Sequence, residues 1–383
     1  MKYPMFKVHV DVDAALTRIE EVLRSGFMNE GTQVTELTNA VSDYFQHKNV
    51  LALNSCTSAI TLALRLAGVK PGDEVISTSM TCVASNTPIH DVGATLVWAD
   101  INAVTGNIDP DKVIEKITSK TKAVLCVNWA GLPCDLERLQ SICRERGIKL
   151  IQDAAHGFGS TLNGKHVCHF ADFTCYSLQA IKHITTGDGG LLVCNDVNDF
   201  NRAKKLKWFG IDREATKDEN GEWKGQRWNV DVVEAGYKYH MNNITAAIGL
   251  SQLSHIDRII TSHQRNAELY TELLKSALLQ PMQVLPNSSP AHWVFTCLLD
   301  ERLDRDAVIL RLKEFGIDAG LVHTPNHYYT CFKDSLCELN ETEYFSQHQM
   351  SLPCGWWLTE EDIRFISSKV TEVISLEYQA LSL

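Results

Sequence analysis

Short apolar runs alternate with amphipathic stretches from about residue 50 onward. The apolar runs fall at residues 50–54, 74–78, 95–100, 123–129, 149–155, 173–178 and 190–195. Helical patterns lie between several of them, for example at residues 57–68 and 135–147. Strands that are apolar along their whole length are typical of parallel sheets covered by helices on both faces. The pattern predicts an α/β fold, and because no full helix separates the last two runs, part of the sheet should be antiparallel or loop-connected.

Helical and polar patterns frame this region. Residues 13–25 have the spacing of a helix, with Asp13 as the N-cap and Gly26 as the stop. The polar stretch 212–235 predicts a long surface insertion, and residues 241–278 predict a helix-rich segment that leads to a second domain. One face of the first helix carries Leu16, Ile19 and Leu23.

The C-terminal region mixes strand and helix patterns. Residues 291–300 predict a strand, and residues 303–316 predict a helix. A chain of 383 residues is long enough for two domains, at the usual size of roughly 100–200 residues per domain. We expect a large domain over residues 1–250, and a linking helix with a small domain over residues 251–383.

Composition excludes several classes of protein. Hydrophobic residues make up 44% and charged residues 22%, which is close to the globular average and excludes a disordered chain. The 36 basic and 47 acidic residues give a net charge of −11 without a Lys/Arg-rich stretch, so we expect neither nucleic-acid nor membrane-surface binding. No apolar run approaches the roughly 18 residues of a membrane span. The twelve cysteines form no Cys-x-x-Cys pair and the N-terminus lacks signal-peptide features, so we expect a cytoplasmic protein.

The segment 174–190, TCYSLQAIKHITTGDGG, is the most informative stretch for chemistry. Lys182 follows an apolar strand and precedes a loop rich in glycine and hydroxyl residues, a composition that permits close approach to a phosphate. A lysine in such a place can form a Schiff base when burial and neighbouring charge lower its pKa. A surface lysine before a glycine turn is the alternative, and this stretch alone leaves both open.

A carboxylate and a histidine stand in the segment 149–159, KLIQDAAHGFG. Asp153 lies at the C-terminal end of an apolar strand, the edge at which open α/β sheets bind ligands. A carboxylate there can keep a heterocyclic nitrogen protonated, or it can merely cap the next helix. His156 can pack against a cofactor or can serve as a structural residue.

Thr57 and Ser58 stand in a polar turn between a strand and an apolar helix. Hydroxyl and backbone N–H groups at a helix N-terminus converge on anions, although an ordinary helix cap has the same composition.

Four histidines are candidate metal ligands: His156, His166, His169 and His183. The pair at 166 and 169 has a ligand-like spacing, but no second pair is spaced to close a site. We therefore expect no functional metal.

Read in order, these segments resemble the DegT-type pyridoxal-phosphate sugar aminotransferases, a branch of the fold-type I aminotransferases. The resemblance covers nearly the whole chain and implies a large domain with a mainly parallel seven-stranded sheet flanked by helices, plus a smaller C-terminal α+β domain. It is carried by SGFMNEGTQVTELTNAVSDYF (25–45), NSCTSAI (54–60), DVGATLVWADI (91–101), QDAAHGFG (152–159), YSLQAIKHITTGDGG (176–190), GYKYHMNNITAAIGLSQL (236–253), LVHTPNHYY (321–329) and SLPCGWWLTEEDI (351–363).

The resemblance implies a role for each matching residue. Lys182 would hold pyridoxal 5'-phosphate as a Schiff base and then shuttle the proton. Asp153 would pair with the pyridine nitrogen, and His156 would lie beside the ring. The phosphate would be held by Thr57, Ser58 and Ser177.

Three positions depart from the family pattern. Cys82, in STSMTCVAS, stands where relatives often have an aromatic residue that stacks on the cofactor ring. Gln179 replaces a frequent histidine before the lysine. Lys238 replaces the usual asparagine that reaches the phosphate of a neighbouring subunit, so the resemblance implies a homodimer with shared active sites and an added charge at this contact.

The resemblance implies transfer of an amino group from an amino acid, expected to be L-glutamate, to a keto group of a sugar. The expected acceptor is a nucleotide-linked 4-keto-6-deoxy sugar. A sugar dehydratase of the same fold is one alternative; it has histidine in the lysine slot, and counting back from Gly190 puts Lys182 there, with His183 one residue later. A non-catalytic cofactor-binding regulator is the other alternative.

Overall fold

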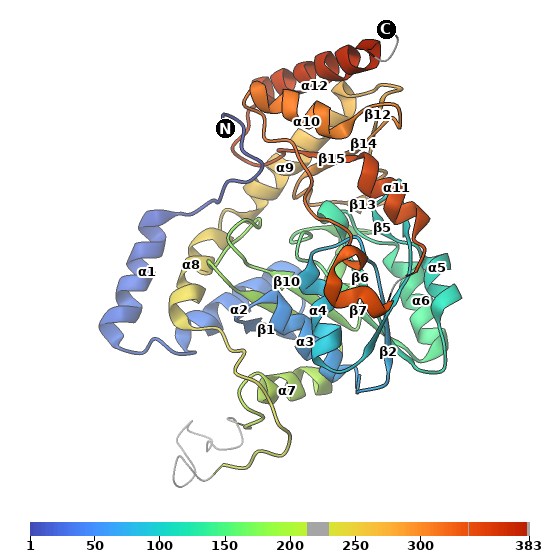
Figure 1. Cartoon of the computed structure of the whole chain (residues 1–383). Helices are drawn as coiled ribbons and strands as arrows, with labels where there is room; N and C mark the ends of the chain where they lie inside the picture. The colour runs from blue at the N-terminus through green and yellow to red at the C-terminus, as the bar shows by residue number, and fades with distance from the viewer. Residues whose placement is uncertain (213–229, 336, 381–383) are drawn as a thin grey trace.

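A computed structural model describes residues 1–212, 230–335 and 337–380 (Figure 1). Its centre is a seven-stranded sheet in the order β1-β11-β10-β7-β6-β2-β3. Each of the seven predicted apolar runs forms one of these strands, so the predicted sheet is confirmed. The strands are β1 (Val50–Leu53), β2 (Glu74–Ser77), β3 (Thr95–Trp98), β6 (Thr121–Val127), β7 (Lys149–Asp153), β10 (Phe173–Ser177) and β11 (Gly190–Cys194).

Strand direction changes only near one edge of this sheet. β3, β2, β6, β7 and β10 run parallel to one another. β11 runs antiparallel to both of its neighbours, β1 and β10, which confirms the prediction of a partly antiparallel sheet. The chain therefore leaves the carboxyl end of β10 at Ser177 and returns beside it at Gly190, its register partner. Lys182 lies in the connecting loop.

Helices cover both faces of the sheet (Figure 1). On one face, α2 (Thr32–Phe45), α6 (Leu136–Arg146) and α8 (Asn243–Leu253) contribute to a buried cluster that includes Phe45, Leu139 and Ala246. On the other face, α3 (Cys56–Leu66), α4 (Val83–Asp91) and α7 (Val197–Leu206) contribute Ile60, Ile89 and Ala203. Burial on both faces explains why these strands are apolar along their whole length.

A second, smaller sheet forms in the C-terminal region, at the top of the view in Figure 1. It is antiparallel, in the order β12 (Leu279–Pro281), β14 (Phe295–Leu299) and β15 (Gln349–Leu352). Its helices are α9 (Ile256–Leu273), α10 (Arg305–Glu314) and α12 (Glu360–Ala380), which share a separate apolar cluster with it. The N-terminal Tyr3 also packs in this cluster and bridges to Ile317. The boundary near residue 250 stays a prediction.

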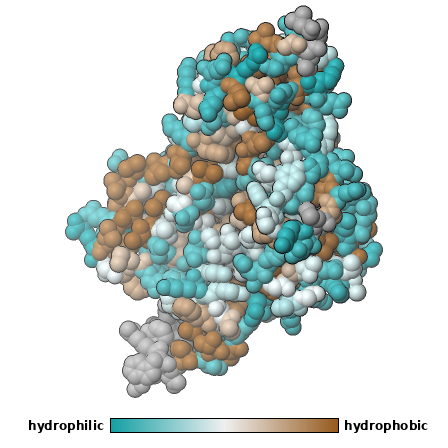
Figure 2. All heavy atoms as spheres, viewed as in Figure 1, coloured by the Kyte–Doolittle hydropathy of each residue, from teal (hydrophilic) through white to brown (hydrophobic). Residues whose placement is uncertain are grey.

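The first helix, α1 (Val12–Ser25), begins one residue earlier than predicted. Its N-cap is Asp11, whose carboxylate accepts the Ala14 N–H (3.1 Å), so the assignment of Asp13 as the cap was wrong. Asp11 has the extended backbone that a cap requires, whereas Asp13 is already in the first turn. Figure 2 shows hydrophobic residues gathered over this helix. They are exposed, and they include Val12, Leu16, Leu23, Phe27 and Met28.

The remaining elements are short. They are β4 (Ile101–Asn102), β5 (Asn107–Ile108), α5 (Pro110–Lys116), η1 (Trp129–Gly131), β8 (Thr161–Leu162), β9 (Lys165–His166), η2 (Val167–His169), β13 (Ser288–Ser289), η3 (Asn326–Tyr328), η4 (Thr330–Ser335) and α11 (Asn340–His348). The predicted surface insertion at 212–235 lies mostly outside the described residues.

Candidate active site

A cavity of about 280 Å³ opens at the carboxyl ends of the parallel strands. Its volume is near the lower end of the roughly 300–1,000 Å³ that is typical of small-molecule sites, and its position is the one at which open α/β sheets bind ligands. Residues that follow β1, β2, β7 and β10 form most of the wall, and two residues come from the C-terminal region. The polar and aromatic lining consists of Ser55, Cys56, Thr57, Thr81, Cys82, Asp153, His156, Ser177, Gln179, Lys182, Asp188, Trp293 and His323.

The loop that carries Lys182 is closed by backbone hydrogen bonds. The Leu178 N–H donates to Gly189 O (2.9 Å), and the Thr186 N–H donates to Leu178 O (2.8 Å). Gly190 leaves no room for a side chain, because a Cβ there would lie 2.3 Å from the carbonyl carbon of Ser55. The loop therefore packs directly against the start of α3, and this contact brings Lys182 and the helix N-terminus to one cavity.

The amine of Lys182 lies in a poorly solvated place. Desolvation lowers the pKa of Lys182 to about 8, although the carboxylate of Asp153 and the thiols of Cys82 and Cys56 partly oppose this shift. A lysine with such a pKa is partly neutral near physiological pH, and only the neutral amine is a nucleophile. The structure thus gives Lys182 the environment that a Schiff-base lysine needs.

Asp153 is buried at the end of β7. Its Oδ2 accepts a hydrogen bond from Ser85 Oγ (2.7 Å), and its Oδ1 accepts the Ala155 N–H (2.9 Å). Ser85 Oγ is also hydrogen-bonded to Thr81 Oγ1 (2.8 Å). Burial raises the pKa of Asp153, and these hydrogen bonds and the charge of Lys182 act in the opposite direction. A cationic group placed in the cavity against this carboxylate would favour its charged form.

The N-terminus of α3 faces the cavity and is capped by Ser55, whose Oγ accepts the Ser58 N–H (3.0 Å). Ser55 Oγ also donates to Ser58 Oγ (2.9 Å), so the Ser58 hydroxyl is engaged by the cap. Thr57 and Ser177 are both part of the cavity wall. A helix N-terminus with nearby hydroxyls attracts and binds anions such as phosphate.

Stacked rings form another part of the wall. The imidazole of His156 stacks on the Trp293 ring at 4.0 Å between centroids, with an interplanar angle of 20°. His323 is nearly parallel to His156 at 5.4 Å, and their Nε2 atoms are 3.5 Å apart. Burial lowers the pKa of His156 well below its usual range and lowers the pKa of His323 to about 3. Both imidazoles are therefore neutral, so they can donate or accept a proton in a hydrogen bond without adding charge.

Asn326 attaches the segment that carries His323 to the loop after β2. Its Nδ2 donates to Thr81 O (2.7 Å), and its backbone N–H donates to Ser79 O (2.8 Å). Asn86 Nδ2 donates to Asn326 Oδ1 (2.9 Å), so the amide of Asn326 is held at both ends. Both asparagines are fully buried. Because this loop carries Thr81, which is hydrogen-bonded to Ser85 in the first turn of α4, this contact connects His323 to the residues that hold Asp153.

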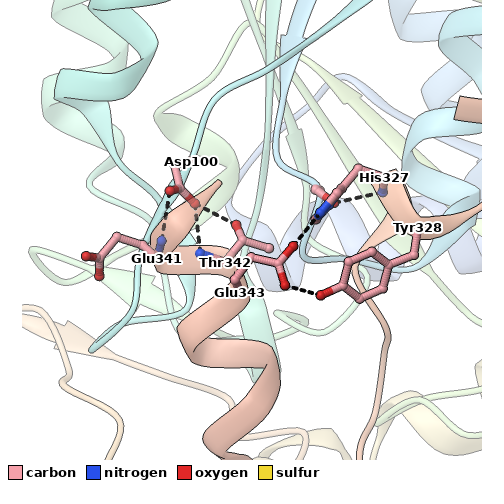
Figure 3. Close-up of polar contacts among 7 residues, drawn as sticks. Asp100, His327, Tyr328, Glu341, Thr342 and Glu343 are labelled. Atoms are coloured by element: carbon pink, nitrogen blue, oxygen red, sulfur yellow. Dashed lines mark hydrogen bonds and ion pairs between the residues drawn. The ribbon is translucent and has the colours of Figure 1, made fainter. Parts of the chain in front are cut away.

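A second set of contacts supports this segment from α11 (Figure 3). His327 is buried, with Nδ1 2.6 Å from Ser79 Oγ and Nε2 2.9 Å from Glu343 Oε1. Glu343 also accepts a hydrogen bond from the Tyr328 hydroxyl. Asp100 fixes the first turn of α11, because its carboxylate accepts the backbone N–H groups of Glu341 and Thr342 and the Thr342 hydroxyl. The helix thus holds His327, and His327 is bonded to the loop after β2.

The structure brings most of the predicted site residues to one cavity: Thr57, Cys82, Asp153, His156, Ser177 and Lys182. Ser58 lies directly behind this wall, in the cap of α3. Lys238 lies in the segment that leads to α8, where its backbone carbonyl accepts a hydrogen bond from Asn54 Nδ2 (3.4 Å) and it forms an isolated β-bridge with Trp208. Lys238 does not line the cavity of the single described chain. The role of each residue stays a prediction.

Several residues of the site are not predicted from the sequence. Thr81 and Ser85 lie in the stretch STSMTCVAS, in which the sequence singles out only Cys82, and their position beside Asp153 depends on how the chain after β2 folds against the end of β7. His323 lies in the motif LVHTPNHYY, which supports the family resemblance, but the resemblance assigns no role to this residue. The sequence places Trp293 within the predicted strand at residues 291–300, but β14 begins at Phe295, two residues after Trp293.

The four histidines that are candidate metal ligands in the sequence have other partners in the structure. His169 contacts the Phe45 carbonyl (2.9 Å), His183 contacts the Ala291 carbonyl (3.1 Å), and His166 packs on Tyr44. Within the described part of the chain, no group of three His, Cys, Asp or Glu side chains could hold a metal ion.

A sequence model of the DegT/DnrJ/EryC1/StrS aminotransferase family matches residues 11–371. The chain belongs to this family. Membership confirms the predicted resemblance, and it identifies the chain as a sugar aminotransferase that depends on pyridoxal phosphate.

Solved structures of family members superpose on nearly the whole chain. CalS13, a sugar aminotransferase from Micromonospora echinospora, is 31% identical with a TM-score of 0.89, covering 97% of this chain and 99% of its own. AtS13 from Actinomadura melliaura is 34% identical with a TM-score of 0.89, covering 96% and 98%. PseC from Helicobacter pylori, an aminotransferase involved in the biosynthesis of pseudoaminic acid, is 25% identical with a TM-score of 0.89, covering 98% and 100%. These likenesses confirm the fold-type I architecture.

The cavity of this DegT-family enzyme fits pyridoxal phosphate. A similar protein, Spr1654 from Streptococcus pneumoniae, has been solved in its PLP form; it is 27% identical with a TM-score of 0.89, covering 98% of this chain and 99% of its own. The wall supplies a lysine of low pKa, a desolvated carboxylate and a helix N-terminus, which match the carbonyl, the ring nitrogen and the phosphate. His156 Nδ1 is buried without a hydrogen-bond partner among the described residues, so a bound group can satisfy it.

Proposed function

We propose that this aminotransferase moves an amino group from L-glutamate to the keto carbon of a nucleotide-linked 4-keto-6-deoxy sugar. The observation that carries the proposal is the meeting of Lys182, Asp153 and the α3 N-terminus around one cavity. Family membership supports the sugar acceptor. The L-glutamate donor, the nucleotide carrier and the 4-keto position are what the family resemblance implies for this chain.

Each wall residue has a separate task in this proposal. Pyridoxal phosphate, when bound, supplies an electron sink for the carbon that gives up its proton. Lys182 holds the cofactor through its amine, and then takes and returns the proton as general base and acid. Asp153 keeps the ring nitrogen protonated by its negative charge. Thr57, Ser58 and Ser177 would hold the phosphate with the α3 N-terminus, and His156 and Cys82 would pack against the ring.

The placement of two adjacent residues supports transamination over dehydration. Lys182 is part of the cavity wall. His183 points to the carbonyl of Ala291 (3.1 Å) and packs its ring on His263 at 4.8 Å, and it does not line this cavity in the described chain. A dehydratase of this fold needs the histidine in place of the lysine, so the register favours the amine chemistry.

The same proposal includes a homodimer with two shared sites. The exposed apolar residues of α1 and the segment after it offer a surface that a second copy can cover (Figure 2). Lys238 would reach the phosphate in the neighbouring subunit and add a charge-assisted hydrogen bond there.

We place the reaction in the cytoplasm. All twelve cysteines are free thiols, which is the usual state in a reducing compartment. Among the helices of the described residues, none combines the length and the apolar character that a membrane crossing requires.

The test is amino transfer to defined acceptors. Protein loaded with pyridoxamine phosphate is incubated with a panel of nucleotide ketosugars, and the products are analysed by mass spectrometry. We expect an aminosugar from a nucleotide-linked 4-keto-6-deoxy sugar, and restoration of the amine form by L-glutamate. A deoxygenated sugar would support the dehydratase, and no reaction with any donor or acceptor would support the regulator.

A further inference from the structure

An aromatic ring covers the amine of Lys182. The Nζ atom lies 3.6 Å from the centroid of the Trp293 ring, which is well within the range of a cation–π interaction. The indole Nε1 of Trp293 donates a hydrogen bond to the carbonyl of Ile181 (2.8 Å), the residue directly before the lysine. One side chain therefore contacts both the backbone that leads to Lys182 and the amine at its tip.

The ring of Trp293 is fixed by its own neighbours. Its side chain is buried, and it stacks on Phe6 at 4.7 Å with an interplanar angle of 22° and on His156 at 4.0 Å. A ring that is packed in this way has a set position, so little freedom is lost when a cation settles on its face.

The surroundings of Lys182 leave a cation poorly compensated. The carboxylate of Asp153 attracts the ammonium group of Lys182 but does not offset the effect of desolvation, and the nearby imidazoles of His156 and His323 are neutral. Since water is largely removed, the ammonium form needs another source of stabilisation. The negative face of an indole is such a source, and its effect grows when the cation is desolvated.

We propose that Trp293 is a positioning residue that holds the ammonium group of Lys182 over its ring whenever this amine is not joined to the cofactor. The proposal rests on the assignment of Lys182 as the cofactor lysine. Between the two half-reactions, the released amine is kept within the cavity, in place for the next proton transfer.

The experiment varies the ring charge without changing its shape. Fluorinated tryptophans with an increasing number of fluorine atoms are placed at position 293, and the cofactor-free protein is labelled competitively with acetic anhydride across pH. The midpoint for Lys182 labelling should fall stepwise with fluorination, by about one pH unit in total, because each fluorine weakens the attraction for the ammonium. At pH 7 the reactive fraction of Lys182 should therefore rise about fivefold, because a pKa of about 8 leaves roughly one tenth of the amine neutral and a pKa one unit lower leaves about half.

The same fluorinated residues at Trp129 are the matched control. Trp129 lies in the same apolar cluster, where its ring packs edge-on against His323 and Phe345. The Lys182 midpoint should not move in this series. A midpoint that is independent of fluorination at position 293, or that moves equally in both series, would overturn the proposal. Because neither cofactor nor substrate takes part, this result is separate from the outcome of cofactor trapping on Lys182.

Discussion

The cavity is enclosed by two walls that differ in chemistry and in origin. The strand-end wall, made of Asp153, Ser177 and Lys182, carries the charges and follows directly from the carboxyl ends of β7 and β10. The C-terminal wall, made of Trp293 and His323, carries neutral rings from the far end of the chain. In the proposed function, the strand-end wall acts on the cofactor through charge, while the C-terminal wall holds groups in place.

The strand-end wall should be the more sensitive one, and Asp153→Asn tests this first. A neutral amide no longer favours a protonated ring nitrogen, so single-turnover amino transfer should slow by roughly 100-fold or more while the cofactor still binds. The matched control is Asp172→Asn, which weakens the partly exposed pair with Lys149 (2.9 Å) and the hydrogen bond from the Leu150 N–H (2.9 Å), neither of which lines the cavity. Turnover of the Asp153 variant at the wild-type rate would show that this carboxylate has only a structural role at the end of β7.

Ser85→Ala tests a link between the two walls, because Ser85 is hydrogen-bonded both to Asp153 and to Thr81, the residue whose carbonyl Asn326 contacts. Loss of its hydrogen bond to the buried carboxylate should slow single-turnover amino transfer roughly tenfold. Ser85→Thr, which keeps the hydroxyl, should recover most of the rate. Equal rates for the alanine and threonine variants would show that this hydroxyl does not support Asp153.

In a shared site, Lys238 of the partner subunit would hold the phosphate together with the α3 N-terminus and the nearby hydroxyls. Lys182→Ala should be inactive, and Lys238→Ala should bind cofactor poorly. If chains of the two variants pair at random in a C2 dimer, half of the dimers are mixed and each has one intact site, so activity should return to about a quarter of wild type. A mixture that stays inactive after verified subunit exchange would place Lys238 in its own subunit's site.

The smallest effect should come from the outer support of the C-terminal wall. Glu343→Gln weakens the contacts to His327 and Tyr328, but Glu343 is partly exposed. We expect the free energy of unfolding to fall by about 0.5–1 kcal/mol and turnover to change less than about twofold. Denaturant titration and steady-state rates measure both quantities. A loss of turnover as large as that of Ser85→Ala would show that α11 controls the reacting groups directly.

The two walls also differ in how far the sequence predicts them. Asp153 and Lys182 follow apolar strands, and chain order alone places the carboxyl ends of parallel strands at one edge. Trp293 and His323 reach that edge only through contacts between segments far apart in the sequence, which no local pattern encodes. Examples are the hydrogen bond from the Trp293 N–H to Ala130 O (2.8 Å) and that from Asn326 Nδ2 to Thr81 O (2.7 Å). Ser58 shows a finer limit, because the sequence cannot tell which of several hydroxyls caps α3 and which faces the cavity. The start of α1 has the same ambiguity, because Asp11 and Asp13 can both be N-caps in the sequence and only the structure identifies Asp11.

Covalent trapping of the cofactor tests directly whether Lys182 is the lysine that binds it. The cofactor-free protein is mixed with pyridoxal phosphate, reduced with borohydride, digested and mapped by mass spectrometry. We predict that the cofactor is attached to Lys182, and that the rate of capture rises with pH and levels off above about 8, because the lowered pKa of Lys182 leaves the amine neutral there. Attachment of the cofactor to a different lysine, or to no lysine, would show that Lys182 does not hold the cofactor.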